Sequence, residues 1–344
     1  MNRFHDQVVL VTGGAQGLGA AMATRFASEG AIVAIGDVNT DAATALSESL
    51  HQQFGRPCAG HRVDVTDSES VNAWIDQVVA DHGRIDVLVN NAGIIRDNRI
   101  EDIDDADWRS VVDASLTGSF YCTRAVLPHM RSRQYGRIVS FSSMSWRGNF
   151  GQANYVAAKA GIIGLARTIA LETARDGITA NAIAPGLIET PMLASMNAPA
   201  REKLVSKVPQ RKTGQPEDIA EAAAYLCSPA AGYVSGVVLD VDGGLGIGSS
   251  IRWHGRKRDS ESVLPENQLR VTFTRHAING CVRMASDRVS ATDSNALRCF
   301  VRGHVTLELD GRFSDHHLSY SHRSPSGSEV CGAAIQCMSA GQLP

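Results

Sequence analysis

The chain has 344 residues, of which 43% are hydrophobic, enough for one large or two ordinary domains with a substantial core. A formal net charge of −3 and a sequence pI near 6.4 give no sign of a nucleic-acid partner, and there is neither a run of 18 apolar residues nor a signal peptide. Seven cysteines without regular spacing argue against a disulfide framework. We therefore expect a soluble, cytoplasmic protein with reduced thiols and no membrane partner.

The N-terminal segment predicts a strand, a glycine turn and a helix. The apolar run QVVLVT is followed by GGAQGLG and then by a segment with helical spacing of apolar residues. Glycines allow a tight turn and close approach of a ligand, and the next helix offers its N-terminal N–H groups to a pyrophosphate. An ordinary tight turn is the alternative. The candidate cofactor contacts here are Gly13, Gln16, Gly17, Leu18 and Gly19.

The second predicted strand, AIVAIG, ends at Asp37. A carboxylate about 20 residues after a glycine turn can accept hydrogen bonds from both adenosine ribose hydroxyls and would repel a 2′-phosphate. This favours NAD over NADP, and Gln16 agrees with it because the turn carries no Arg or Lys. The alternative is that Asp37 caps the helix that begins near Thr40. Val38 is a further candidate cofactor contact.

Further strands alternate with helices. A β-rich run at 59–63 leads to Asp64 and Val65, and the strand IDVLV leads into NNAG. This alternation indicates a Rossmann-like, doubly wound α/β fold with a parallel sheet of about seven strands and helices on both faces. Ligands bind at the carboxyl ends of such strands, although Asp64 is also typical of a simple turn. The candidate cofactor contacts here are Asp64, Val65, Asn91, Ala92 and Gly93.

Tyr155 and Lys159 are four residues apart in YVAAK, on one face of a predicted helix. The ammonium would favour the phenolate and lower the pKa of Tyr155, which makes the pair a candidate general acid/base. A solvated lysine beside a half-buried tyrosine is the alternative. The predicted strand at 137–141 ends at Ser142 and Ser143, where a hydroxyl can hydrogen-bond a substrate carbonyl while the tyrosine supplies the proton.

The strand ITANAIA ends in PGLIET. Pro185 and Gly186 stop the strand and expose the Ile188 N–H and the Thr190 hydroxyl to a nicotinamide carboxamide or a phosphate, with a plain loop as the alternative. Residues 191–212 predict a mobile flap over the site. A helix in QPEDIAEAAAYLCS and a last strand before VDGG complete the pattern.

Together these motifs resemble the short-chain dehydrogenase/reductase family over about residues 1–250, and GNFGQANY and PGLIET are most similar to its 3-oxoacyl-thioester reductases, of acyl carrier protein or CoA type. The resemblance implies an NAD-dependent oxidoreductase that interconverts a secondary alcohol and a ketone, without a metal, as a homotetramer. It implies that Tyr155 is the acid/base, that Lys159 binds the nicotinamide ribose, and that a serine orients the substrate oxygen. The hydride chemistry belongs to the cofactor.

The chain departs from the family pattern in two places. Ser115 replaces the usual asparagine, whose helix kink anchors a water in the proton relay, so we expect a reduced or rearranged relay rather than a dead site. SSMSWRGN is one residue shorter than the family's stretch. Counted forward from the strand, the catalytic serine is Ser143; counted back from Tyr155, it is Ser142. We prefer Ser143, because a deletion fits more easily in a loop.

Acyl-carrier-protein reductases of this family usually take NADPH and dock the carrier on arginines. The corresponding positions read Gln134 and Asp176, although Arg133 and Arg175 are adjacent. We therefore expect a small ketone, a hydroxyacyl-CoA or another secondary alcohol as substrate. A catalytically weak dinucleotide-binding regulator or scaffold is the rival function, and an intact serine, tyrosine and lysine favour the enzyme.

Residues 251–344 form a C-terminal extension of unknown fold, rich in serine and histidine and with little periodicity. LRVTFT and HVTLEL each predict a strand. A metal site is weakly indicated, because no C-x-x-C or H-x-x-x-H spacing occurs. A partly disordered extension, a small interaction domain and a sequence never selected for a fold all remain open. The ligand candidates are Cys281, Cys299, His304, His316, His317, Cys331 and Cys337.

Overall fold

The computed structural model describes residues 2–190, 193 and 196–247, and four two-residue strands beyond them. The chain divides into two compact units, Met1–Trp253 and His254–Pro344. In the second unit two short antiparallel pairs are described, β8 with β9 and β10 with β11. HVTLEL lies outside the described residues, as do the ligand candidates of the extension except Cys299. The pairs are β8 Gln268–Leu269, β9 Val289–Ser290, β10 Arg298–Cys299 and β11 Ala333–Ala334.

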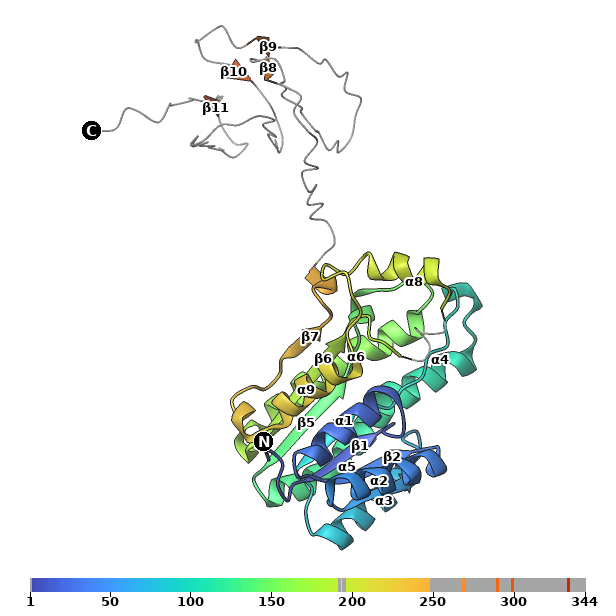
Figure 1. Cartoon of the computed structure of the whole chain (residues 1–344), viewed down its shortest axis with the longest axis vertical. Helices are drawn as coiled ribbons and strands as arrows, with labels where there is room; N and C mark the ends of the chain where they lie inside the picture. Colours follow the sequence, from blue (N-terminus) through green and yellow to red (C-terminus); the bar gives the residue numbers. More distant parts are fainter. Residues whose placement is uncertain are drawn as a thin grey trace, which may run out of the picture. The chain divides into compact units, whose positions relative to one another are not determined.

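The first unit is built on a seven-stranded sheet with the order β3-β2-β1-β4-β5-β6-β7, and all neighbouring strands are parallel (Figure 1). The order reverses between β1 and β4, which is where open α/β sheets bind ligands. The predicted doubly wound fold is confirmed. The strands are β1 Val8–Thr12, β2 Ile32–Asp37, β3 Cys58–Arg62, β4 Val87–Asn90, β5 Gly136–Phe141, β6 Ile178–Pro185 and β7 Val238–Val241.

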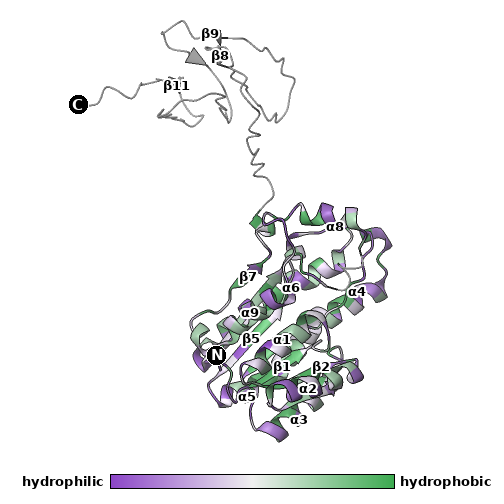
Figure 2. Ribbon diagram, viewed as in Figure 1, coloured by the Kyte–Doolittle hydropathy of each residue, from purple (hydrophilic) through white to green (hydrophobic). Residues whose placement is uncertain are grey.

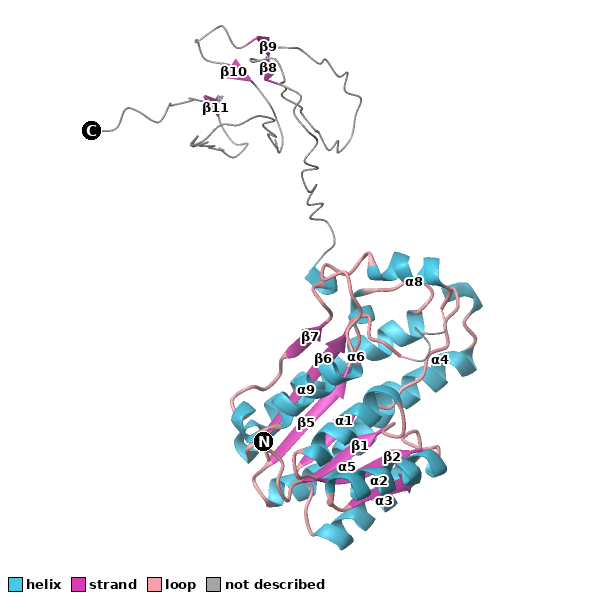
Figure 3. Ribbon diagram, viewed as in Figure 1, coloured by secondary structure: helices cyan, strands magenta, loops and turns pink. Residues whose placement is uncertain are grey.

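Helices cover both faces of this sheet (Figure 3). Apolar side chains of α1, α2 and α9 form one buried cluster with the strands, and those of α3, α5 and α6 form another on the opposite face. β1, β4 and β5 are buried along their whole length, as expected for parallel strands between two helix layers. Figure 2 shows the hydrophobic colour of β1 between the helices. The helices are α1 Gly17–Ser28, α2 Thr40–Phe54, α3 Ser68–His82, α4 Asp105–Val112, α5 Gly118–Ser132, α6 Ala153–Thr173, α8 Ala198–Val205 and α9 Pro216–Cys227.

A π-helical turn, Asp113–Thr117, joins α4 to α5 and carries Ser115. The sequence of this segment, which contains VVDASLTGSFYCTRAV, predicts one helix over about 107–130; the structure extends it from Asp105 to Ser132 and places the π-turn inside it. Single π-turns inside helices occur frequently at functional sites. Ser115 in this π-turn is therefore a candidate functional residue.

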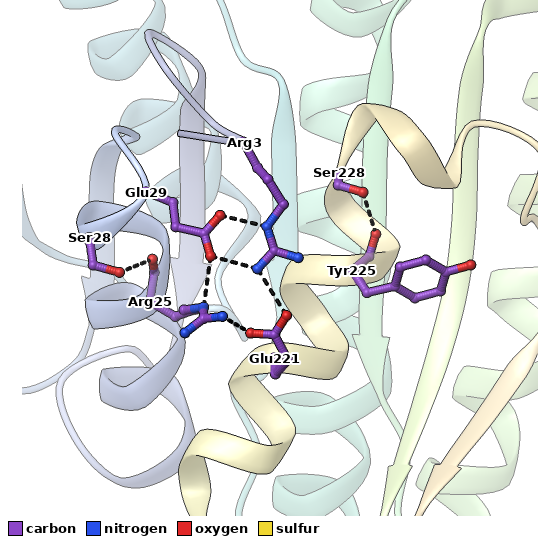
Figure 4. Close-up of polar contacts among 7 residues, drawn as sticks. All are labelled: Arg3, Arg25, Ser28, Glu29, Glu221, Tyr225 and Ser228. Atoms are coloured by element: carbon purple, nitrogen blue, oxygen red, sulfur yellow. Dashed lines mark hydrogen bonds and ion pairs between the residues drawn. The ribbon is translucent and has the colours of Figure 1, made fainter. Parts of the chain in front are cut away.

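Ion pairs attach the N-terminal segment to α1 and α9 (Figure 4). Glu29, which is only 5% exposed, accepts a hydrogen bond from the Arg3 Nε at 2.5 Å and forms an ion pair with the Arg25 Nε at 2.8 Å. Both arginines also pair with Glu221 of α9, the Arg3 Nη2 at 3.0 Å. Since Glu29 is buried between two cations, its removal leaves both guanidinium groups without their main partner.

We expect Glu29→Gln to lower the free energy of unfolding by about 1–3 kcal/mol, because a buried charge partner is lost while the arginines stay partly exposed. The hydrogen bond from Arg3 holds the pKa of Glu29 below its ordinary value of 4.5. The stabilisation is thus present above that value and is lost as the pH falls through the lowered pKa. Urea unfolding at pH 7 and in acid measures both effects. Glu48→Gln on the exposed face of α2 is the control, and equal effects of the two changes would contradict the expectation.

Candidate active site

The glycine turn after β1 has the conformation that its sequence predicts. Gly13 and Gly17 adopt φ of +59° and +55°, a region that favours glycine. A Cβ at Gly19 would lie 2.2 Å from the Gly13 carbonyl oxygen, whereas a Cβ at Gly17 would meet no atom within 4 Å. Gln16 is the N-cap residue of α1 without a side-chain capping bond, and the first turn holds no acid. The open space before this helix N-terminus fits a pyrophosphate.

Asp37 joins the end of β2 to this turn. Its Oδ2 accepts from the Ala15 N–H at 3.1 Å and its Oδ1 from the Asn39 N–H at 3.0 Å. The alternative that Asp37 caps α2 is wrong, because Asn39 is the N-cap and its Oδ1 accepts from the Ala42 N–H at 3.1 Å. The backbone bonds fix the carboxylate beside the glycine turn. Val38 next to it is 64% exposed.

Arg62 lies beside Asp37, and the sequence reading missed it. The two residues are partners in the parallel register of β2 and β3, so their side chains leave the same face of the sheet. Arg62 is exposed, and it forms no ion pair within the part of the chain that the structure describes. The sequence around Arg62 does not indicate that it lies next to Asp37, because this proximity follows only from the pairing of β2 with β3.

The motif after β4 holds the glycine turn in place, whereas Asp64 after β3 forms a local turn of its own. The Asp64 Oδ1 accepts from the Thr66 N–H at 2.9 Å, so Asp64 forms a turn, which was the alternative to a cofactor contact. The neighbouring Val65 is 8% exposed. The Asn91 Nδ2 donates to the carbonyls of Thr12 and Gly13 at 3.1 and 2.9 Å.

Thr12 at the end of β1 also holds the loop after β4. Its Oγ1 accepts hydrogen bonds from the N–H groups of Asn91 and Ala92 at 3.0 and 3.1 Å. A Cβ at Gly93 would lie 2.9 Å from the Ser115 Oγ and 3.4 Å from the Lys159 Nζ. Glycine at this position therefore allows the loop after β4 to approach both side chains.

The two candidate serines have different partners. The Ser142 hydroxyl donates to the Lys159 carbonyl at 2.8 Å and is 3% exposed. The Ser143 hydroxyl accepts from the Ser145 N–H at 3.2 Å, and it lies near enough to the Tyr155 phenol to act on the pKa of that group. Ser142 thus fastens β5 to α6, whereas Ser143 contacts the tyrosine.

Burial raises the pKa of Tyr155 above its ordinary value of 10, and although the Ser143 hydrogen bond opposes this, the Asp97 carboxylate adds to it. The expected lowering by Lys159 is wrong for this structure. The Lys159 Nζ donates to the Phe141 carbonyl at 2.7 Å and lies over the tyrosine ring, 5.4 Å from its centroid. Burial lowers the pKa of Lys159 to about 8. At neutral pH Tyr155 is therefore a protonated phenol beside a buried ammonium.

Ser115 lies in the π-turn with its side chain fully buried, and its Oγ has no hydrogen-bond partner among the described residues. Its carbonyl accepts from the Ser119 hydroxyl at 2.6 Å. Within the same residues, Phe141 is the acceptor found for the Lys159 ammonium, which can donate three hydrogen bonds. An unpartnered hydroxyl and an ammonium that both lie close to Gly93 fit a bound polar group.

The loop after β6 closes the site on the other side. A Cβ at Gly186, which follows Pro185, would lie 2.5 Å from the Asp242 Cα. The Ile188 N–H makes no hydrogen bond to residues that the structure describes, and the Thr190 Oγ1 accepts from the Leu193 N–H at 3.3 Å.

Part of the predicted flap at 191–212 is the helix α8. Its Arg201 Nη2 pairs with the Glu189 Oε2 at 2.6 Å, which ties α8 to PGLIET. Residues 191, 192, 194 and 195 lie outside the described part of the chain. The mobility of the flap stays a prediction.

No three His, Cys, Asp or Glu side chains gather as a metal site in the described part of the chain. The described cysteines Cys58, Cys122 and Cys227 are free thiols. No described helix combines the length and the apolar character that crossing a bilayer requires.

Comparisons with known proteins agree with this geometry. A protein-family model described as enoyl-(acyl carrier protein) reductase matches residues 13–246. A 3-oxoacyl-[acyl-carrier-protein] reductase of Thermotoga maritima is 41% identical over 246 residues, 71% of this chain and 100% of that protein. The (2S)-[(R)-hydroxy(phenyl)methyl]succinyl-CoA dehydrogenase subunit BbsD of Thauera aromatica is 39% identical over 239 residues, 70% of this chain and 96% of that protein.

A solved structure is similar as well. The crystal structure of levodione reductase has a TM-score of 0.69 at 37% sequence identity, and the match covers 71% of this chain and 99% of that one. The residues matched by the family model lie within the first unit.

Proposed function

Because the chain belongs to the short-chain dehydrogenase/reductase family, we propose that it is an NAD(H)-dependent oxidoreductase that interconverts a secondary alcohol and a ketone. Membership makes it an oxidoreductase that uses a nicotinamide dinucleotide. The observation that carries the rest is the position of Ser143 next to the half-buried Tyr155, with the Lys159 ammonium over the tyrosine ring.

In the proposed reaction Tyr155 donates its proton to the carbonyl oxygen of the substrate, and the Ser143 hydroxyl hydrogen-bonds the same oxygen. A raised pKa keeps the phenol protonated at neutral pH, which suits a general acid in the reductive direction. The Lys159 ammonium stabilises the phenolate that remains. Ser115 would act beside Lys159 in returning a proton from solvent to the tyrosine. Its hydroxyl is buried and has no hydrogen-bond partner among the described residues.

The dinucleotide is proposed to lie along the carboxyl ends of the strands, where it supplies the hydride. The glycine turn, with Gly13, Gly17 and Gly19, would hold the pyrophosphate, and Asp37 the adenosine ribose. The unpartnered Ile188 N–H would bind the nicotinamide carboxamide. Further proposed contacts are Gln16, Leu18, Val38, Asp64, Val65, Asn91, Ala92, Gly93, Lys159, Pro185, Gly186 and Thr190.

For the substrate we propose an acyl-CoA-type thioester or a cyclic or small ketone rather than a carrier-bound acyl chain. Two of the relatives named above are described as acting on a succinyl-CoA derivative and on levodione. At the positions that resemble carrier-docking arginines, Asp176 accepts from the neighbouring Arg131 Nε at 2.9 Å, and Gln134 is neutral. Although Arg133 and Arg175 nearby are exposed, the negative charge of Asp176 and the neutral Gln134 weaken the attraction of this patch for an acidic carrier protein.

A paired initial-rate assay tests this function. NADH and NADPH are each offered with 3-oxoacyl-CoA thioesters, small ketones and cyclic ketones, and the reverse reaction is run with the alcohols. Turnover of one class with NADH is the expected result. Tight NADH binding without any turnover would instead favour the dinucleotide-binding regulator.

We expect Ser143→Ala to lower kcat about 10²-fold, because one hydrogen-bond donor to the developing oxyanion is lost. Ser142→Ala removes the bond to the Lys159 carbonyl, so its main effect is a loss of about 1 kcal/mol in the free energy of unfolding. Steady-state kinetics and urea unfolding of both variants give the comparison. The reverse pattern, with the larger kcat loss at Ser142, would reassign the catalytic serine.

A further inference from the structure

Two loops meet beside the proposed catalytic residues, the loop between β4 and α4 and the loop between β5 and α6. The Asn98 N–H donates to the Gly151 carbonyl at 2.9 Å, and Asn98 forms a parallel bridge with Gln152. The Asn154 Nδ2 donates to the Arg96 carbonyl at 3.0 Å. Since Asn154 precedes Tyr155, these bonds hold the first loop against the start of α6.

A side-chain pair lies at the centre of this junction. The Gln152 Nε2 donates to both carboxylate oxygens of Asp97, at 3.1 and 2.9 Å. On its other side the Gln152 Oε1 accepts from the Asn149 Nδ2 at 2.8 Å. Gln152 is thus bonded to both loops at once.

Further hydrogen bonds continue from this pair to the tyrosine. The Asn149 Nδ2 lies 3.4 Å from the Ser145 Oγ, and the Ser145 N–H donates to the Ser143 Oγ at 3.2 Å. The Ser143 hydroxyl in turn lies next to the Tyr155 phenol and lowers its pKa. A chain of polar contacts therefore leads from Asp97 through the β5–α6 loop to the phenol.

The same two loops border a cavity of about 380 Å³. Its lining includes Ile100 of the first loop, Phe150 of the second, and Val156, the residue after Tyr155. Ile100 and Phe150 are 76% and 84% exposed, so neither is held by an apolar core. These two side chains therefore add little hydrophobic packing to the junction, where the polar bonds described above join the two loops.

We propose that Asp97 and Gln152 form a latch that positions Ser143 and Tyr155 for the reaction. This inference rests on the proposed function. Neither residue is catalytic, since each acts through other groups. An exposed polar pair contributes little to global stability, so the expected effect of the latch is on alignment. Misplacement of a reacting group by about 1 Å can cost about 10²-fold in rate.

Because Asp97 is charged and Gln152 is neutral, substitutions of the two latch residues should have different effects on the pH profile. Asp97 bears a negative charge that raises the pKa of Tyr155, and Gln152 is neutral. A further charged group beside the tyrosine is the Lys159 ammonium of α6, which lies 5.4 Å from the centroid of the ring. Asp97→Asn should therefore move the alkaline limb of the reductive pH profile to lower pH, whereas Gln152→Ala should leave it in place.

A matched control exists on α3, remote in the fold. The Gln77 Nε2 donates to both oxygens of Asp81 at 2.9 and 3.0 Å, the same arrangement in an exposed position. We expect Gln152→Ala to lower kcat about 10²-fold with dinucleotide affinity changed by less than about twofold. Gln77→Ala should change neither. The double variant Asp97→Asn with Gln152→Glu reverses donor and acceptor, and it should recover most of the lost kcat.

A second readout does not depend on turnover. Amide hydrogen exchange across 142–152 should accelerate in Gln152→Ala and stay unchanged in Gln77→Ala. If the wild type turns over and Gln152→Ala matches its control in rate and exchange, the latch is refuted. If the wild type has no turnover, the proposed function fails, and the exchange comparison still decides whether the latch holds the loop. A double variant no better than Gln152→Ala would also contradict the pairing.

Discussion

Tyr155→Phe is expected to lower kcat about 10²- to 10⁴-fold, the usual contribution of a positioned general acid, while dinucleotide binding persists. The substitution removes only the hydroxyl. Lys159 keeps its bond to the Phe141 carbonyl, and the phenyl ring keeps its place under the ammonium. Steady-state kinetics with NADH and a fluorescence titration of NADH binding give the two quantities.

Tyr233→Phe is the matched control, because Tyr233 is fully exposed at the surface and loses the same atom. Its kcat should equal that of the wild type. Unchanged turnover in Tyr155→Phe would remove the tyrosine from the mechanism. Loss of NADH binding in the same variant would show that the hydroxyl acts on the cofactor instead, and the proton donor would then have to be sought elsewhere.

The fold could be predicted because its signals are local. β1 is a run of apolar residues with a glycine turn directly after it, and α9 begins at Pro216 where the sequence places a helix start. Alternation of such strands and helices leaves few topologies, since parallel crossovers are right-handed. These rules predict a parallel, doubly wound sheet, and the structure supplies the order of its seven strands.

The missed features are those that depend on distant neighbours. Arg62 meets Asp37 only through the register of two strands, and Asp97 meets Gln152 only where two loops touch. The π-turn at Ser115 changes the hydrogen-bond pattern over five residues without disturbing the apolar pattern.

Electrostatics were predicted less well than topology. The four-residue spacing of Tyr155 and Lys159 predicted a lowered tyrosine pKa, but spacing carries no information on burial. In the structure burial dominates for both groups, and it shifts each pKa toward the neutral form of the side chain. An ammonium that is itself buried and bonded to the Phe141 carbonyl does not offset this.

Asp37→Asn should lower the ratio of kcat/KM for NADH to that for NADPH about 10- to 100-fold. The carboxylate is held beside the glycine turn by the N–H groups of Ala15 and Asn39, in a position that fits the adenosine ribose. A hydrogen bond to a charged group contributes about 1.5–3 kcal/mol, and the asparagine also removes the repulsion of a 2′-phosphate. Initial rates with both cofactors at a fixed substrate concentration measure the ratio.

Substitution of Arg62 tests how Asp37→Asn changes the preference between NADH and NADPH. In Asp37→Asn the carboxylate no longer repels a 2′-phosphate, so the neighbouring guanidinium should attract that phosphate and raise kcat/KM for NADPH. Adding Arg62→Ala should remove that gain and leave the NADH value of the single variant unchanged. An unaltered cofactor ratio in Asp37→Asn, in protein whose urea unfolding matches the wild type, would refute the assignment of Asp37 to the ribose. If Asp37→Asn lowers the ratio of kcat/KM for NADH to that for NADPH and Arg62→Ala does not change this result, the carboxylate alone determines the choice between the two cofactors.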